Sequence, residues 1–284
     1  MKISVAMAFN EHTPVGFIKD AVQMVEAKGV HGIWVPEHVL FYPEYASTYP
    51  YADDGRIPGN PEGLLDPFTA LTFIAAHTER VRLGTGICLL PQRQPVYTAK
   101  MVADLDYLSG GRVDFGVGIG WLKEEFDSLG MDFSTRASRT EEYIMVMRAL
   151  WSEGISEFSG KTVELAPCHF NPKPVQKPHP PIIFGGESDP ALRRVARMGD
   201  GWYGYDLTPE ALVERLPGLD AALAASGRSR QDIQLIVGPN RHPVNPETIA
   251  AYAAAGTDQL VVPVFAGSIE KLASRLDLLM SSAA

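Results

Sequence analysis

The chain has 284 residues, of which 45% are hydrophobic and 21% charged, which is typical of a globular protein with a sizeable core. Its net charge is −9 and its lysines and arginines are scattered. This argues against a nucleic-acid groove, because phosphate neutralisation needs clustered positive charge. No apolar run approaches the roughly 18–20 residues of a membrane span, and the amino-terminal segment lacks a signal-peptide cleavage site. We therefore expect a cytoplasmic protein.

The two cysteines, Cys88 and Cys168, are far apart in the sequence. They show neither the spacing of a zinc site nor that of a disulfide framework. We expect no metal site.

Apolar, β-rich runs alternate with helical patterns along the chain. The predicted strands cover residues 3–8, 32–35, 81–87, 113–118, 181–185, 201–205, 233–237 and 259–264. The predicted helices cover residues 15–29, 66–78, 95–111, 138–154, 188–199, 208–227, 245–256 and 268–280. Eight strands, each followed by a helix, predict an α/β fold with a parallel sheet, most economically a closed (β/α)8 TIM barrel in a single domain over residues 1–284. A doubly wound open sheet is the alternative.

Two insertions interrupt this alternation. Residues 39–65 follow the second strand and are rich in proline, glycine and tyrosine, which indicates an ordered lid. The lid tyrosines either line an aromatic pocket or form dimer contacts; they are Tyr42, Tyr45, Tyr49 and Tyr51. Residues 154–180 precede the fifth strand and alternate like a hairpin before an extended, proline-rich stretch.

The fourth strand ends in the glycine-rich stretch "RVDFGVGIGW", residues 112–121. A dinucleotide-binding loop needs glycines at its first, third and sixth positions, and counting from Gly116 or Gly118 places Trp121 or Lys123 at the sixth. In a barrel, glycines at a strand end leave backbone without side chains, on which a flat ring could lie. The alternative is tight packing within the barrel rim.

Two further strand ends carry candidate chemistry. The segment "IIFGGESDPALRR", residues 182–194, leaves a strand through two glycines and opens a helix, an arrangement that favours a phosphate, with Arg193 or Arg194 adding charge. A helix capped only for its own stability is the alternative. "WVPEH" ends the second strand, where Glu37 and His38 occupy the position at which barrel enzymes place catalytic groups.

With these motifs in place, the sequence resembles the bacterial luciferase-like superfamily of flavin and deazaflavin enzymes. The resemblance spans nearly the whole chain, through "WVPEH", "RVRLGTGICLLPQRQPVYTAKMVADLDYLSGGRVDFGVGIGW", "EEF" and "PPIIFGGESDPALRRVARMGDGWYG". The branch it resembles most is that of the coenzyme F420-dependent oxidoreductases. The resemblance implies a TIM barrel, a cofactor at its mouth and a homodimer.

The resemblance also implies roles for individual residues. The third-strand segment with Thr85, Gly86 and Ile87 would carry a bulge, often a non-proline cis peptide, that supports the ring together with Gly116 and Gly118 of the fourth strand. The phosphate contacts would fall on Gly185, Gly186 and Glu187, with Arg194 nearby, and His38 would face the reactive ring edge.

One departure concerns the position after the fourth-strand glycines. Sugar-phosphate dehydrogenases of the superfamily carry a proton-donating glutamate where this chain has Trp121, and an indole cannot take that role. We expect Trp121 to wall an apolar substrate pocket or to stack on the ring.

The sequence thus predicts an F420-dependent oxidoreductase that acts on a small organic molecule, with His38 assisting proton transfer. The alternative cofactor is FMN, in a monooxygenase that uses oxygen and a flavin or F420 reductase as partner. A second class is a barrel hydrolase with Glu37 and either Glu124 or Glu125 as paired carboxylates. A non-catalytic flavin-binding relative is the third.

Overall fold

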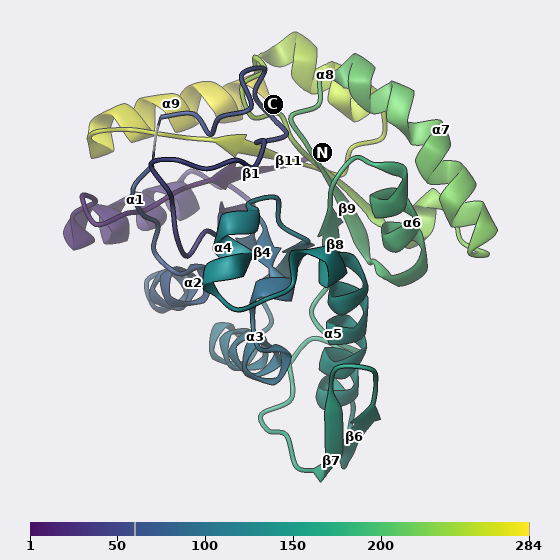
Figure 1. The fold of residues 1–284 in the computed structure, drawn as a ribbon. Helices are drawn as coiled ribbons and strands as arrows, with labels where there is room; N and C mark the ends of the chain where they lie inside the picture. Colours follow the sequence, from purple (N-terminus) through teal and green to yellow (C-terminus); the bar gives the residue numbers. More distant parts are fainter. Residues whose placement is uncertain (60, 284) are drawn as a thin grey trace.

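The structure is a computed structural model that describes residues 1–59 and 61–283. Eight parallel strands close into a barrel that is surrounded by helices (Figure 1). The strands pair in the order β3-β2-β1-β11-β10-β9-β8-β5, and the pairing of β3 with β5, at Leu83 and Val113, closes the ring. This confirms the predicted TIM barrel. The barrel strands are β1 (Lys2–Ala6), β2 (Gly32–Val35), β3 (Arg82–Thr85), β5 (Val113–Gly118), β8 (Ile182–Gly185), β9 (Gly201–Tyr205), β10 (Gln234–Gly238) and β11 (Gln259–Pro263).

The helices form the outer layer and agree with the sequence prediction to within a few residues at their ends. They are α1 (Val15–Ala27), α2 (Pro67–Ala76), α3 (Pro95–Ser109), α5 (Arg136–Trp151), α6 (Asp189–Met198), α7 (Pro209–Ala225), α8 (Pro246–Ala254) and α9 (Ile269–Ser282). Side-chain capping helps to set where helices begin. At the start of α2, the Asp66 carboxylate accepts a hydrogen bond from Thr69 N. None of the helices that the structure describes is long and apolar enough to cross a membrane.

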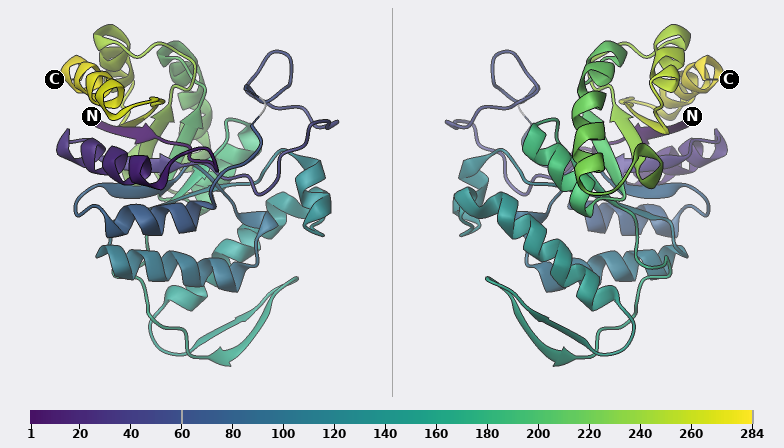
Figure 2. Two further views of the ribbon diagram at one scale, coloured as in Figure 1. Left: turned by 90° about the vertical axis from the view of Figure 1, so that its left-hand side faces the viewer. Right: turned by 90° about the vertical axis from the view of Figure 1, so that its right-hand side faces the viewer.

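The two insertions take different forms. Strands β6 (Ser156–Ser159) and β7 (Glu164–Cys168) form the predicted antiparallel hairpin, which extends away from the barrel (Figure 2). The lid, of which residues 39–59 and 61–65 are described, runs without helix or strand across the carboxyl ends of the strands. A short helix after β5, α4 (Lys123–Ser128), was not predicted as an element, because six residues are too few to show a helical period.

The third strand is interrupted as the family resemblance implied. It stops at Thr85, the peptide bond between Gly86 and Ile87 is cis, and the chain resumes as β4 (Cys88–Leu89), which pairs with β5. Gly86 N donates to the carbonyl of Val35, so this bulge lies directly beside the end of β2.

In the direction in which a side chain would point, the fourth-strand glycines face occupied space rather than an open bed of backbone. A Cβ atom on Gly118 would lie 2.3 Å from Cδ1 of Ile87, and one on Gly185 would lie 2.5 Å from the same atom. A Cβ on Gly116 would lie 2.0 Å from the carbonyl oxygen of Thr85 and 3.1 Å from the Trp34 ring. The glycines therefore make room for Ile87 and Trp34, which is the tight-packing alternative.

The barrel interior is correspondingly aromatic. Trp34 is fully buried and stacks on Tyr203 with 5.3 Å between ring centroids. Ile183, Ile236 and Val261 complete this inner cluster, while a larger apolar core fills the layer between the strands and the helices. Because the interior is filled with side chains, we expect the reacting groups to lie at the carboxyl-terminal rim of the barrel.

We predict that Gly116→Ala lowers the free energy of unfolding by about 3 kcal/mol, since the added methyl group meets a backbone carbonyl that cannot move aside. Chemical denaturation of the variant measures the loss. Gly16→Ala in α1 is the matched control, because a Cβ there has no neighbour within 4 Å, and it should leave stability equal or slightly higher. Equal stability of the two variants would contradict the packing argument.

Candidate active site

His38 lies just beyond the end of β2, and its ring is held from one side by Glu125. The Nδ1 atom of His38 is 3.0 Å from a carboxylate oxygen of Glu125, in the short helix α4. The His38 side chain is 11% exposed and that of Glu125 is fully buried. Gln92 donates a second hydrogen bond to the same carboxylate oxygen, at 2.9 Å.

The other Glu125 oxygen holds the start of the lid. It accepts hydrogen bonds from the backbone N–H groups of Val39, at 2.6 Å, and Leu40, at 3.0 Å. Burial acts to raise the pKa of Glu125, but the hydrogen bonds from His38, Leu40 and Gln92 outweigh burial and hold its pKa below the usual range. Glu125 is therefore ionised, with four donors arranged around one buried charge.

These contacts define which His38 nitrogen carries the proton. An ionised carboxylate only accepts hydrogen bonds, so Nδ1 of His38 is the donor toward Glu125. On the opposite edge, the indole N–H of Trp121 points at Nε2 of His38 from 3.3 Å, and an indole nitrogen only donates. Nε2 is therefore an unprotonated acceptor directed toward Trp121.

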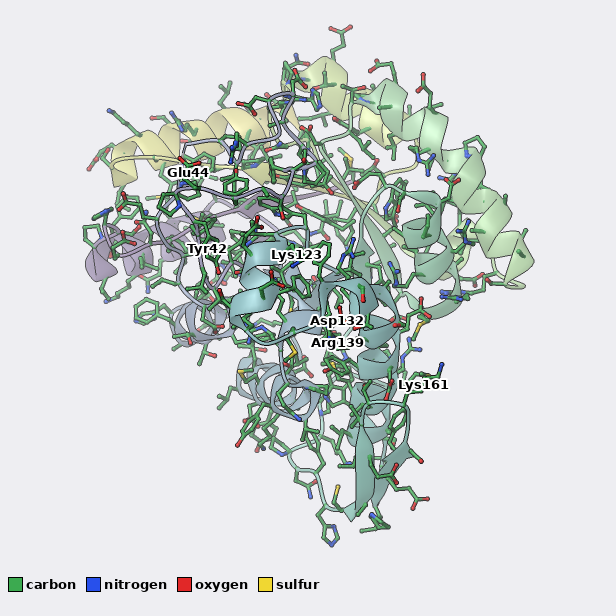
Figure 3. All side chains as sticks on the ribbon, viewed as in Figure 1. Tyr42, Glu44, Lys123, Asp132, Arg139 and Lys161 are labelled. Atoms are coloured by element: carbon green, nitrogen blue, oxygen red, sulfur yellow. The ribbon has the colours of Figure 1, made fainter. Side chains whose placement is uncertain are left out.

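The lid is fastened to α4 by a second glutamate. Glu124 accepts hydrogen bonds from the backbone N–H groups of Ala46, at 2.6 Å, and Ser47, at 3.1 Å, and from the Ser47 hydroxyl, at 2.7 Å. Burial acts to raise the pKa of Glu124, but these bonds prevail and lower it to about 2. Tyr42 also bonds α4, through the Glu124 carbonyl, and Figure 3 shows Tyr42 and Lys123 on this side of the molecule.

The middle of the lid docks at the ends of the strands β8 and β9. The Tyr51 hydroxyl donates to Glu187 at 2.9 Å, and the other Glu187 oxygen accepts the backbone N–H of Tyr205. Burial raises the pKa of Glu187, only partly offset by these bonds. The Tyr51 ring packs edge to face on Tyr205, and Tyr49 does so on Trp121, at centroid distances of 4.8 and 5.2 Å.

Two residues predicted for the site have other partners. Glu37 is buried and accepts hydrogen bonds from Leu89 N, at 2.6 Å, and from Arg93. Glu37 and Glu125 are thus both engaged by hydrogen bonds within the protein, an arrangement that does not favour the paired, accessible carboxylates of a hydrolase. The buried Thr85 hydroxyl donates to the carbonyl of Gly116.

The predicted phosphate turn is formed, but its charged side chains face elsewhere. Gly186 adopts φ +107°, and the side chain of Ser188, the N-cap of the ten-residue helix α6, makes no capping hydrogen bond. Arg194 is buried, with Glu141 of α5 3.5 Å away, and Arg193 lines a groove between α6 and α7. Neither guanidinium is therefore directed at the turn.

The sequence predicted His38 and Trp121 but gave Glu125 a role only in the hydrolase alternative. Gln92 was missed entirely. The "EEF" motif drew attention to Glu124 and Glu125, but the sequence does not show which of these two glutamates faces the barrel mouth.

A family model described as luciferase-like monooxygenase matches residues 4–255 of this chain. The chain belongs to the luciferase-like monooxygenase family. An uncharacterized member from Mycobacterium tuberculosis (strain ATCC 25618 / H37Rv) is 32% identical over 267 residues, which cover 90% of this chain and 92% of the relative. The family is one of oxidoreductase enzymes, so the chain is an enzyme.

Solved structures with the luciferase-like barrel include proteins with different cofactors. An F420-dependent secondary alcohol dehydrogenase in complex with an F420–acetone adduct superposes with a TM-score of 0.76 at 16% identity, covering 100% of this chain and 99% of that one. A riboflavin lyase with modified FMN superposes with a TM-score of 0.78 at 14% identity, covering 99% and 90%. At these identities the likeness shows the shared fold.

We predict that Glu124→Ala loosens the lid and speeds proteolytic cleavage within residues 39–59 at neutral pH, because three hydrogen bonds to Ala46 and Ser47 are lost. Limited proteolysis with mass spectrometry measures the rate. A lowered pKa means that the hydrogen bonds to Glu124 are complete above about pH 4.5 and are lost only as the pH falls toward 2, so wild-type protection at Ala46 and Ser47 should not change between pH 5 and 8. Glu44→Ala is the control, since Glu44 is exposed (Figure 3). Equal cleavage rates in Glu124→Ala and Glu44→Ala would contradict the role of the Glu124 hydrogen bonds in holding the lid.

Proposed function

We propose that this luciferase-like protein transfers hydride between coenzyme F420 and a small organic substrate, with His38 exchanging the proton of the substrate oxygen. The observation that carries the proposal is the fixed His38 ring, whose unprotonated Nε2 faces Trp121 at the carboxyl ends of the barrel strands. The F420-dependent dehydrogenase with the same fold supports it.

The residues present fit a deazaflavin with an anionic tail. The uncapped start of α6 and the Gly185–Gly186 turn offer backbone N–H groups to a phosphate. The raised pKa of Glu187 makes its neutral form more accessible, which suits a position close to an anion. The Gly86–Ile87 bulge, beside β2, would support the ring.

Bound F420 would supply the carbon that accepts or delivers hydride. In the oxidation of an alcohol, Nε2 of His38 takes the hydroxyl proton as the hydride leaves the carbinol carbon, and the product is a carbonyl compound. The carboxylate of Glu125 holds the ring orientation and stabilises the imidazolium that results. In the reverse direction, the imidazolium returns the proton to the substrate oxygen.

A monooxygenase that uses FMN is the second candidate. Pyrimidine monooxygenase RutA from Bradyrhizobium sp. (strain BTAi1 / ATCC BAA-1182) is 33% identical over 176 residues, which cover 58% of this chain and 47% of the relative. Such an enzyme would need reduced flavin from a reductase partner. The homodimer and the cytoplasmic location stay predictions.

Titration of the purified protein with F420 and, separately, with FMN tests the cofactor. We expect F420 to quench tryptophan fluorescence at micromolar concentration, since Trp34 packs on the Gly86 bulge and Trp121 contacts His38. Quenching by FMN alone would select the monooxygenase. Failure of both to bind would reject a redox role.

His38→Ala should leave F420 binding intact and lower turnover by about 10²- to 10⁴-fold, the loss expected for a general acid or base. Unchanged turnover would remove His38 from the mechanism.

Glu125→Gln separates positioning from catalysis. The amide can still accept from Val39 N, but it presents an N–H group toward Nδ1 of His38 and so favours the other tautomer. We expect kcat to fall by at least about 10²-fold and the ¹⁵N NMR shifts of the His38 ring to exchange. Glu124→Gln, on the neighbouring residue, should leave the tautomer unchanged. An unaltered tautomer in Glu125→Gln would contradict the positioning role.

A further inference from the structure

Aromatic rings surround the reactive edge of His38. Phe41 and Trp121 lie 5.1 and 5.8 Å from the His38 ring, centroid to centroid. Tyr45 and Tyr49 pack edge to face on Trp121 at 5.6 and 5.2 Å. A substrate that reaches Nε2 of His38 must therefore contact or displace these aromatic side chains.

The polar atoms around these rings are largely engaged with the protein. The Tyr45 hydroxyl accepts the backbone N–H of Ile57 at 2.8 Å, and the Tyr51 hydroxyl donates to Glu187. In the described part of the chain, Nε2 of His38 has the indole N–H of Trp121 as its one hydrogen-bond partner, at a long 3.3 Å. A substrate hydroxyl can replace this weak bond with a shorter one.

The charge near His38 is negative. Glu125 is buried and ionised directly behind the ring. The cation on the Tyr49 side, Arg241, is already shared between Asp53 and Asp206, at 3.6 and 3.5 Å. An anionic group beside His38 would meet a buried carboxylate, and none of the described lysine or arginine side chains hydrogen-bonds the His38 ring to balance it.

Other cations do not offset the negative charge near His38. Arg56 is exposed, donates to the carbonyl of Tyr45 and lies over the Tyr45 ring, 4.6 Å from its centroid, so solvent screens its charge from the reacting centre. Lys271 and Arg275 of α9 line a groove with Phe9 and Phe265 that does not include His38. Neither set offers a partner for an anion at the reacting centre.

We infer that this site selects uncharged alcohols or carbonyl compounds that carry an aromatic or alicyclic ring, and rejects phosphates and carboxylates. The inference rests on the proposed function for the reacting groups and adds the substrate class. The ring of the substrate packs among Phe41, Tyr49 and Trp121 while its oxygen bonds Nε2 of His38.

The test uses acetophenone and phenylglyoxylate, in which a carboxylate replaces the methyl group. Isothermal titration of each into the protein, alone and loaded with F420, measures affinity without turnover. We expect acetophenone to bind about tenfold or more tightly. Tyr49→Ala should weaken that binding, whereas Tyr97→Ala, at an exposed tyrosine of α3, should not.

Turnover gives a second readout with the corresponding alcohols: the F420-loaded enzyme should oxidise 1-phenylethanol in preference to mandelate. Equal or tighter binding of phenylglyoxylate, tighter binding of the cation phenacyltrimethylammonium, or binding of no probe would overturn the substrate class. Failure of F420 to bind, with the acetophenone preference intact on the protein alone, would reject the proposed reaction instead.

Discussion

The buried carboxylate of Glu125 is the contact on which the arrangement of the active site depends. A charge without solvent must be surrounded by donors, and here the donors come from two separate parts of the chain: the consecutive residues His38, Val39 and Leu40, and Gln92. Satisfying one charge therefore fixes both the path of the lid and the tautomer of the imidazole. Loss of Glu125 would disturb the lid and the His38 ring together.

The barrel rim beneath this site is shaped by a side chain rather than by bare backbone. Ile87 lies against Gly118 and Gly185, and this packing fixes where the chain bulges between β3 and β4. The bulge lies beside the end of β2, from which the chain continues to His38. Packing inside the barrel and placement of the reacting imidazole are thus parts of one local structure.

The lid ties the two sides of the barrel mouth through unlike contacts. At α4 it is held by an ionised carboxylate, that of Glu124, whose low pKa keeps the bonds constant around neutrality. At β8 and β9 it is held by Tyr51 on Glu187, a carboxyl group whose pKa burial has raised. The hydrogen bonds to Glu124 do not change with moderate changes in pH. The hydrogen bond from Tyr51 to Glu187 depends on burial among the tyrosine rings, which excludes water.

The sequence by itself determined the barrel, because eight alternations of an apolar run and a helical period admit few other folds, and strand ends at His38 and the Gly185–Gly186 turn necessarily meet at one face. It also determined that Trp121 stands where a proton-donating glutamate stands in sugar-phosphate dehydrogenases of the superfamily it resembles. Only the tertiary structure decided which acid serves His38, since Glu37 is adjacent in sequence but bonds Arg93, whereas Glu125 arrives from a six-residue helix with no period to read. The tertiary structure also decided that Ile87 fills the space beside Gly118 and Gly185. Both outcomes depend on which way side chains from distant strands point, and that direction is set by packing across the barrel rather than by any local pattern.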